Sequence, residues 1–221
     1  MVRLKRFNKI ENIIFFPSGL GQKKPGLENT PSIIRDCIIK KSKNKKLKLP
    51  NMYWINCERS NNIYNNLNTL YHTNQQINGK RINIGGDHSM SIATVASSLN
   101  NYPNLKLIWI DAHADINTSY SSPSNNMHGM PLGILMHLYD PANIPGFEWM
   151  KDVPKLKPEQ LSYIGLRDVD QGEANFVREH NIQTFTMHHI DLYGIGGVVN
   201  KVLKHHGDRP LHMSYDIDAV D

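Results

Sequence analysis

The segment Leu105-Lys-Leu-Ile-Trp-Ile110, followed at once by Asp111-Ala-His-Ala-Asp115, decides the fold. A short, mostly apolar run of this kind predicts a β-strand, and the acidic residues mark its carboxyl end. Other apolar runs bounded by turn residues occur along the chain, and helix-like segments separate most of them. Such alternation is typical of a mostly parallel sheet covered by helices, so we predict a three-layer α/β/α fold.

The same patterns predict the other elements of the fold. Further strands are predicted at 13–16, 52–55, 81–84, 161–165, 184–187 and 211–215. Helices are predicted to begin near residue 31 and to span 89–99, 130–138, 173–180 and 196–205. The asparagine-rich stretch that includes Asn61-Asn62 and Asn65-Asn66 gives no firm pattern, because Asn side chains compete for backbone hydrogen bonds. We predict that residues 1–221 form a single α/β domain.

Length and composition exclude several classes of protein. The chain has 221 residues, 39% of them hydrophobic and 20% charged, which is enough to bury a core and argues against general disorder. No run of 18 apolar residues is present, so no membrane-spanning segment is expected. The basic start Met1–Phe7 lacks the long apolar run of a secretory signal, and two cysteines are too few for a disulfide scaffold. We therefore expect a soluble, cytoplasmic protein.

Much of the formal net charge of +5 comes from the lysine-rich run Lys40–Lys48. Clustered lysines can bind the phosphates of nucleic acids, and such binding would weaken steeply with salt. No aromatic side chain lies among these lysines to stack on bases. We therefore interpret the run as a solvated surface segment, and we expect no nucleic-acid partner.

Acidic and imidazole side chains follow three of the predicted strands. Ligands of parallel α/β sheets bind beyond the carboxyl ends of the strands, so these side chains are expected to meet there. In an extended chain, side chains at i, i+2 and i+4 also point the same way. The candidate metal ligands are His88, Asp111, His113, Asp115, Asp216 and Asp218. Four carboxylates and two imidazoles without a thiolate suit manganese. Taken singly, His88 could be a turn residue and the acids a surface cluster.

Five motifs in order resemble those of the arginases in the ureohydrolase superfamily. They are Gly85-Gly-Asp-His-Ser89, Asp111-Ala-His-Ala-Asp-Ile-Asn117, Met127-His-Gly129, Ile164-Gly-Leu-Arg-Asp-Val-Asp170 and Ser214-Tyr-Asp-Ile-Asp218. The resemblance extends from Gly21-Gln22 to the last residue. The segments ending at Asn117 and Asp170 look more like arginase proper than like agmatinase.

The resemblance implies a centre with two Mn²⁺ ions per subunit that hydrolyses L-arginine to L-ornithine and urea. One ion would be held by His88, Asp111, Asp115 and Asp216, and the other by Asp111, His113, Asp216 and Asp218. Asp111 and Asp216 would then bridge the ions. A hydroxide between the ions, hydrogen-bonded to Asp115, would attack the guanidinium carbon of the substrate.

The resemblance also assigns residues around the substrate. His128 would shuttle a proton to the leaving group, which suits an imidazole because its reference pKa is ~6.5. The residues expected to bind the amino-acid end of arginine are Asn117 and Ser124 for the α-carboxylate, and Asp170 and Glu173 for the α-amino group, with Asp168 beside them. As alternatives, these acids could cap a helix N-terminus and His128 could be an ordinary loop histidine.

The chain differs from the arginase pattern at its carboxyl end. Arginases are homotrimers that continue beyond the motif ending at Asp218, and their next strand inserts between the strands that end here at Gly85 and Asp216. We therefore expect the C-terminal strand and helices to be missing, and a gap in the sheet. With that gap, residues 1–221 are expected to be weakly active or inactive and prone to unfold.

Two alternative functions remain open. The chain could be another ureohydrolase, agmatinase-like, that acts on a different guanidino compound. It could also be a catalytically silent protein that binds a metal or a partner. The six intact candidate ligands argue against the silent protein, whereas the absent C-terminal segment argues for it.

Overall fold

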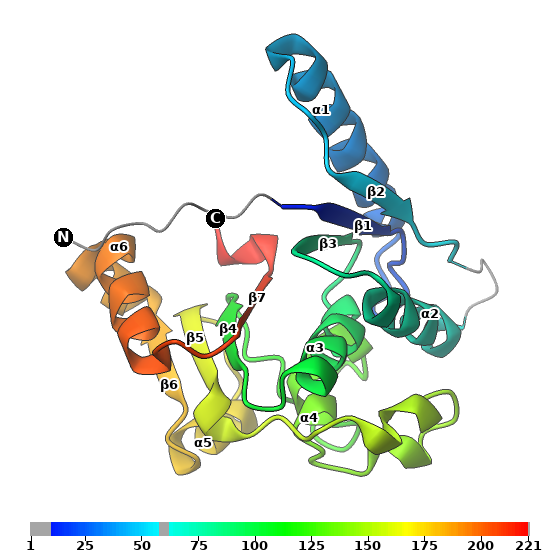
Figure 1. Ribbon diagram of the computed structural model, residues 1–221. Helices are drawn as coiled ribbons and strands as arrows, with labels where there is room; N and C mark the ends of the chain where they lie inside the picture. Colours follow the sequence, from blue (N-terminus) through cyan, green and yellow to red (C-terminus); the bar gives the residue numbers. More distant parts are fainter. Residues whose placement is uncertain (1–9, 58–61, 221) are drawn as a thin grey trace.

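A computed structural model describes residues 10–57 and 62–220, so the Met1–Phe7 segment and Asp221 lie outside the described residues. The strands are β1 Asn12–Phe16, β2 Asn51–Trp54, β3 Arg81–Gly85, β4 Lys106–Ile110, β5 Leu161–Leu166, β6 Gln183–Thr186 and β7 Leu211–Tyr215. They form one sheet of order β2-β1-β3 and a second of order β6-β5-β4-β7 (Figure 1). Each pair of neighbouring strands in these sheets is parallel, as predicted.

Helices cover both faces of the two sheets. They are α1 Thr30–Lys45, α2 Ile63–Gln76, α3 Met90–Asn101, α4 Pro131–Leu135, α5 Gln171–Glu179 and α6 Met187–His206. Alternate residues of β4 face opposite layers: Leu107 and Trp109 lie in the large core, and Ile108 packs with Val198 and Val202 of α6. The large core also holds Leu67 of α2 and apolar residues of α3 and α4. The predicted three-layer α/β/α fold is therefore confirmed.

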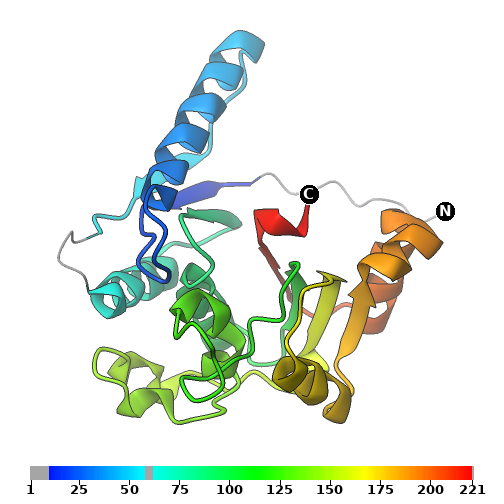
Figure 2. The same ribbon diagram turned by 180° about the vertical axis from the view of Figure 1, so that it is seen from behind.

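The sheet is interrupted between β3 and β7, as expected. Within the described residues, β3 pairs only with β1, and β7 pairs only with β4. Both views show the two groups of strands side by side, with β3 and β7 at their facing edges (Figures 1 and 2). Leu211, Met213 and Tyr215 on one face of β7 are 47%, 61% and 47% exposed. This uncovered apolar edge lies beside the carboxyl ends of the strands that carry the candidate ligands.

Helix α2 lies in the asparagine-rich stretch, for which no element was predicted. The side chain of Asn62 accepts a hydrogen bond from the backbone N–H of Asn65 and caps the helix, which is a position that Asn favours. Leu67 and Leu70, three residues apart on one helical face, are fully buried in the large core. Tertiary burial of these leucines thus outweighs the weak local preference for a helix.

Two predicted helices have different bounds in the structure. The helix predicted at 130–138 ends at Leu135, and His137 has a left-handed backbone with φ of 51°. The helix predicted at 196–205 begins at Met187 instead. Gly194 interrupts it with φ of 68°, a conformation that costs glycine little, so two helical segments follow one another.

The lysine-rich run lies at the end of α1 and just beyond it. In both views this helix projects away from the rest of the molecule (Figures 1 and 2). All six lysines between residues 40 and 48 are exposed, which agrees with a solvated surface segment. Among the described residues, no helix combines the length and the apolar character needed to cross a bilayer.

Candidate metal centre

A cavity of about 260 Å³ lies at the carboxyl ends of β4, β5 and β7. It is lined by Asp111, His113, Asp115, Asn117, His128, Gly129, Asp168, Asp170, Glu173, Asp216 and Asp218. Seven of these residues are acidic, and the lysines and arginines of the described chain are absent from the lining. So many carboxylates around one cavity favour a cationic occupant.

His88 comes from the turn after β3 and does not line the cavity itself, but it lies against carboxylates that do. The residue is only 7% exposed, and its ring stacks on Trp109 with the ring centroids 4.2 Å apart. Its Nε2 atom lies 2.8 Å from the hydroxyl oxygen of Ser214 on β7. These two contacts fix the ring so that the other nitrogen, Nδ1, points toward the carboxylates.

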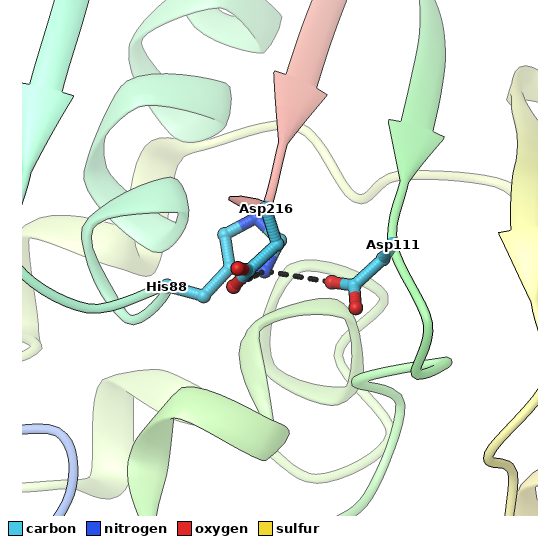
Figure 3. Close-up of side chains that lie close together, drawn as sticks. All are labelled: His88, Asp111 and Asp216. Carbon is cyan, nitrogen blue, oxygen red and sulfur yellow. Dashed lines mark ion pairs between the residues drawn. The ribbon is translucent and has the colours of Figure 1, made fainter. Parts of the chain in front are cut away.

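Three carboxylates converge on that nitrogen. His88 Nδ1 lies 2.9 Å from an oxygen of Asp111 and 3.3 Å from one of Asp216 (Figure 3). It also lies 2.9 Å from an oxygen of Asp115. Ligand atoms of His88, Asp111 and Asp216 lie within 4.8 Å of one another, close enough to share one ion. The ring therefore joins the first sheet to the acidic ends of the second.

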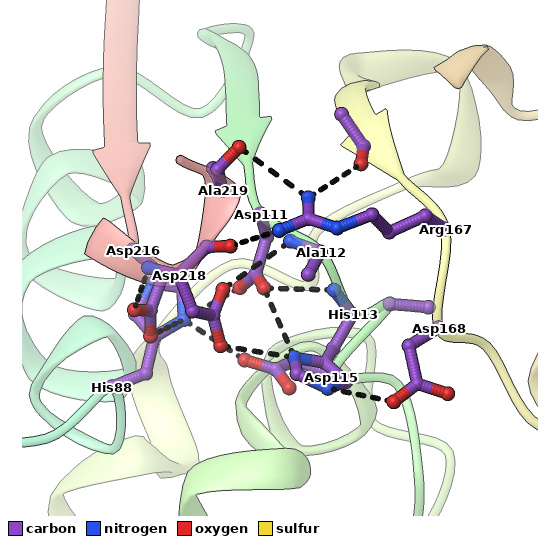
Figure 4. A network of polar contacts seen from close by, with 12 residues as sticks. His88, Asp111, Ala112, His113, Asp115, Arg167, Asp168, Asp216, Asp218 and Ala219 are labelled. Carbon is purple, nitrogen blue, oxygen red and sulfur yellow. Dashed lines mark hydrogen bonds and ion pairs between the residues drawn. The ribbon is translucent and has the colours of Figure 1, made fainter. Parts of the chain in front are cut away.

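A second group of ligands shares Asp111 with the first. It consists of Asp111, His113 and Asp218, whose ligand atoms also lie within 4.8 Å of one another. His113 Nδ1 is 3.5 Å from Asp111 and 3.1 Å from Asp218 (Figure 4). The backbone N–H of Ala112 donates to the Asp218 carboxylate at 3.3 Å. Two adjacent positions for a cation thus have one carboxylate in common.

The prediction that an extended chain brings Asp111, His113 and Asp115 together is wrong. Strand β4 ends at Ile110, and the next residues form bends. The backbone N–H of His113 donates to the Asp111 carboxylate at 2.8 Å, and Asp115 has a left-handed backbone with φ of 51°. A tight turn, rather than strand alternation, therefore directs these side chains into the cavity.

Burial and neighbouring charges shift the pKa values of His88 and Asp115 at this site. Burial alone would lower the pKa of His88, but the carboxylates of Asp111 and Asp115 outweigh it and raise the pKa to about 10. Burial raises the pKa of Asp115 to about 7, and the charges of Asp111 and Asp216 act in the same direction. Without a metal, a proton on His88 offsets part of the crowded negative charge.

The residues present fit a pair of divalent cations. Carboxylate oxygens and imidazole nitrogens are suitable ligands, and the two groups offer both. Nδ1 of His88 is buried and makes no well-aligned hydrogen bond, although three carboxylates surround it. A cation among these atoms would satisfy the nitrogen and the carboxylates together.

The outer part of the cavity is built around the start of α5. The side chain of Asn117 donates to the Asp170 carboxylate at 2.8 Å. Asp170 also caps α5 by accepting from the backbone N–H of Glu173 at 2.9 Å, so it has the capping role considered above while it lines the cavity. Glu173 accepts from the N–H of Ile116 at 3.1 Å, and burial raises its pKa to about 6.

The other predicted substrate residues differ in position. His128 lines the cavity, and burial lowers its pKa. The side chain of Asp168 is 86% exposed at the mouth, with one oxygen 3.5 Å from His113 Nε2. Ser124 is exposed and does not line the cavity, and its hydroxyl accepts from the N–H of Asn126 at 3.2 Å. The structure thus brings together every predicted site residue except Ser124.

Three supporting residues had no predicted role. Ser214 and Trp109 orient His88, and Trp109 Nε1 also donates to Asp111 at 3.1 Å. Each lies on a strand, two positions before the ligand that directly follows that strand, and this spacing is the signal that could have revealed it. Asp87 accepts from the backbone N–H of Gly21 at 2.8 Å and so holds the loop next to His88.

Comparisons with known proteins agree with this arrangement. A family model described as "Arginase family" matches residues 12–221. The chain is 43% identical over 166 residues to the arginase of Saccharomyces cerevisiae, a match that covers 72% of this chain and 48% of that protein. The chain therefore spans about half the length of the curated relatives it matches.

Solved structures of arginases are also similar to this chain. The arginase of Bacillus subtilis has a TM-score of 0.86 and 32% identity, with 96% of this chain and 76% of that one covered. The arginase of Entamoeba histolytica, solved in complex with L-ornithine, has a TM-score of 0.82 and 28% identity, with 95% and 76% covered.

Proposed function

The chain belongs to the arginase family, and from this premise we propose that it hydrolyses L-arginine to L-ornithine and urea at a centre of two manganese ions. The observation that carries the proposal is the pair of ligand groups that share Asp111 inside a cavity lined by seven acidic residues. A guanidinium group is planar and cationic, so it suits such a cavity.

The two ions would be held by the residues at the floor of the cavity. One would bind His88, Asp111 and Asp216, with Asp115 close by, and the other would bind Asp111, His113 and Asp218. When bound, paired ions of this kind lower the pKa of a water molecule and orient it for attack, here on the guanidinium carbon. Ser214 and Trp109 would keep His88 in its ligating orientation.

The outer residues would hold the amino-acid end of arginine. The α-amino group would bind the carboxylates of Asp170 and Glu173, and the α-carboxylate would bind the side-chain amide of Asn117. Support comes from the Asn117–Asp170 hydrogen bond, which places a donor and an acceptor side by side in the cavity. Ser124 would join them only after its loop moves inward, because its side chain is now exposed.

His128 would carry the proton for the leaving group. Burial lowers its pKa, so the imidazole is neutral near neutral pH and can accept a proton at a ring nitrogen. It can then give that proton to the amino group of ornithine as the carbon–nitrogen bond breaks. Its position on the cavity wall supports this role.

We further propose that the full-length protein acts in the cytoplasm as a homotrimer. The described cysteines, Cys37 and Cys57, are both free, which accords with a reducing compartment. Sedimentation equilibrium of the purified protein would test the assembly: a mass three times that of the chain supports it, and a monomer contradicts it.

Urea release tests the proposed activity most simply. The protein is freed of metal with a chelator, supplied with Mn²⁺ or Mg²⁺, and given L-arginine or agmatine, which lacks the α-carboxylate. We expect turnover that is slow, given the break in the sheet, dependent on Mn²⁺, and faster with L-arginine. Faster turnover of agmatine would favour an agmatinase-like enzyme. Tight metal binding without urea release would favour the silent protein.

A further inference from the structure

The segment that carries Asp218 is weakly held by packing. It forms the short 3-10 helix η6, Ile217–Ala219, directly after β7. Its neighbouring apolar side chains face solvent, with Ile217 74% and Val220 61% exposed. Within the turn, the N–H of Asp218 bonds only to the carboxylate of Asp216, at 3.2 Å. Something outside the turn must therefore set where the Asp218 carboxylate points.

Arg167 makes that connection from the end of β5. Its guanidinium donates to the carbonyl oxygen of Asp218, to that of Ala219 at 3.3 Å and to that of Gly165 at 3.4 Å (Figure 4). Its backbone N–H donates to the carbonyl of Ala112 at 2.9 Å. One residue thus joins η6 to the loop that lies between the ligands Asp111 and His113.

The two metal positions depend on this connection to different degrees. Asp216 is anchored independently, because its backbone N–H donates to the carbonyl of Ile110 at 2.9 Å in continuation of the β4–β7 ladder. His88 is buried and fixed by Ser214 and Trp109. Asp218 is different, since its backbone is held only within its own turn and by Arg167, and its carboxylate contacts Ala112, His113 and the neighbouring Asp111 among the described residues.

We propose that Arg167 is a positioning residue that holds the Asp218 carboxylate opposite His113, and so controls occupancy of the metal position formed by Asp111, His113 and Asp218. This inference rests on the proposed two-metal function. The planar guanidinium can bond to several carbonyl oxygens at once, whereas a lysine ammonium on a flexible stem would hold them less firmly. The position formed by His88, Asp111 and Asp216 should respond little.

The test compares Arg167→Met with Arg178→Met, which removes an exposed arginine from α5. Mn²⁺ binding is followed by calorimetry, and electron paramagnetic resonance distinguishes a coupled pair of ions from a single ion. For Arg167→Met we expect the first dissociation constant to stay within about twofold and the second to rise about tenfold, in the range typical of residues that orient metal ligands. The coupled signal should weaken at equal Mn²⁺, and Arg178→Met should behave like the wild type.

Each outcome has a distinct meaning. Two unaltered binding steps and a full coupled signal in Arg167→Met would overturn the role of Arg167 and leave the two-metal proposal standing. A wild-type protein that binds fewer than two Mn²⁺ would overturn both. If Arg167→Met does not fold, as judged by circular dichroism, Arg167→Lys replaces it, and its second dissociation constant should lie between those of the wild type and a tenfold loss.

Discussion

Asp111 is the residue on which both metal positions depend. Its carboxylate lies 2.9 Å from His88 and 3.5 Å from His113, and it belongs to both ligand groups. Trp109 and the backbone N–H of His113 donate to its two oxygens, so the carboxylate is fixed before any metal binds. Removing the negative charge of Asp111 should therefore weaken the binding of both ions.

The substitution Asp111→Asn should abolish binding of both Mn²⁺ ions. An amide has nearly the same shape but only one weakly basic oxygen, so we expect the affinity at each position to fall at least about 100-fold. The metal content after dialysis measures this loss. The control Asp168→Asn removes an equal charge from an exposed residue outside both groups and should leave two ions bound. Equal metal content in the two variants would contradict the shared role of Asp111.

His206, the last residue of α6, should make stability depend on pH. The side chain is 3% exposed, and neither ring nitrogen has a hydrogen-bond partner among the described residues. Burial, assisted by the positive charges of Lys106, His205 and Arg209, lowers its pKa from 6.5 to about 4. Between these values the unfolded chain binds more protons, so stability decreases as the pH falls from 6.5 toward 4.

Replacing His206 with Leu should remove this contribution. We expect the free energy of unfolding to fall less between pH 6.5 and 4.5 than in the wild type, by up to about 2 kcal/mol. Urea unfolding at several pH values measures the difference. His205→Leu, at the exposed neighbouring position, should keep most of the wild-type pH dependence, because burial, the largest cause of the shift, still acts on His206. A residual slope in His206→Leu is expected from His212, whose pKa burial also lowers to about 4. Identical slopes in all three proteins would refute the assignment.

At the scale of elements, the edge strand β7 should promote self-association. Leu211, Met213 and Tyr215 form an exposed apolar face, and the strand has no described partner on the β3 side. Unpaired, apolar edges readily pair with other chains, and charged side chains on an edge prevent this. Association should therefore depend on the character of this face.

The substitution Met213→Lys should lower association without disturbing the buried layers, because Met213 is 61% exposed. Light scattering over a range of protein concentrations measures the effect. Leu47→Lys adds the same charge to a residue that is 60% exposed beyond α1, and it should leave association unchanged. If both variants reduce association equally, net charge and not the β7 edge is responsible.

The elements differ in how well the sequence predicted them. The β4 strand and its acidic end were predictable, because a local apolar run meets a change of composition. Helix α2 was not, since it depends on burying Leu67 and Leu70 in a core that forms only in the whole fold. The turn that places Asp115 was also hidden, because a left-handed residue other than glycine has no clear sequence signal. The exposed position of Ser124 was hidden for a similar reason, because the conformation of its loop decides its exposure.

For the whole molecule, metal binding should join the two sheets. His88 follows β3 of one sheet, whereas Asp111 and Asp216 follow β4 and β7 of the other. The two sheets already share the large core, in which Phe16 and Trp109 are buried. An ion held by ligands from both sheets adds a connection across the break between β3 and β7.

Manganese should therefore raise the unfolding temperature of the protein. A ligand present at 100 times its dissociation constant stabilises the folded state by about 2.7 kcal/mol, which corresponds to roughly 5–10 °C for a chain of this size. Differential scanning fluorimetry with Mn²⁺, with Mg²⁺ and with a chelator measures the shift. No difference between Mn²⁺ and chelator would mean that the ion does not bind selectively to the folded state.

Anomalous X-ray scattering at the manganese absorption edge, from crystals grown with Mn²⁺, tests the central claim most directly. We predict two peaks in the acidic cavity, one bounded by His88, Asp111 and Asp216 and the other by Asp111, His113 and Asp218. An empty cavity at full Mn²⁺ supply, or ions bound only elsewhere, would contradict the claim.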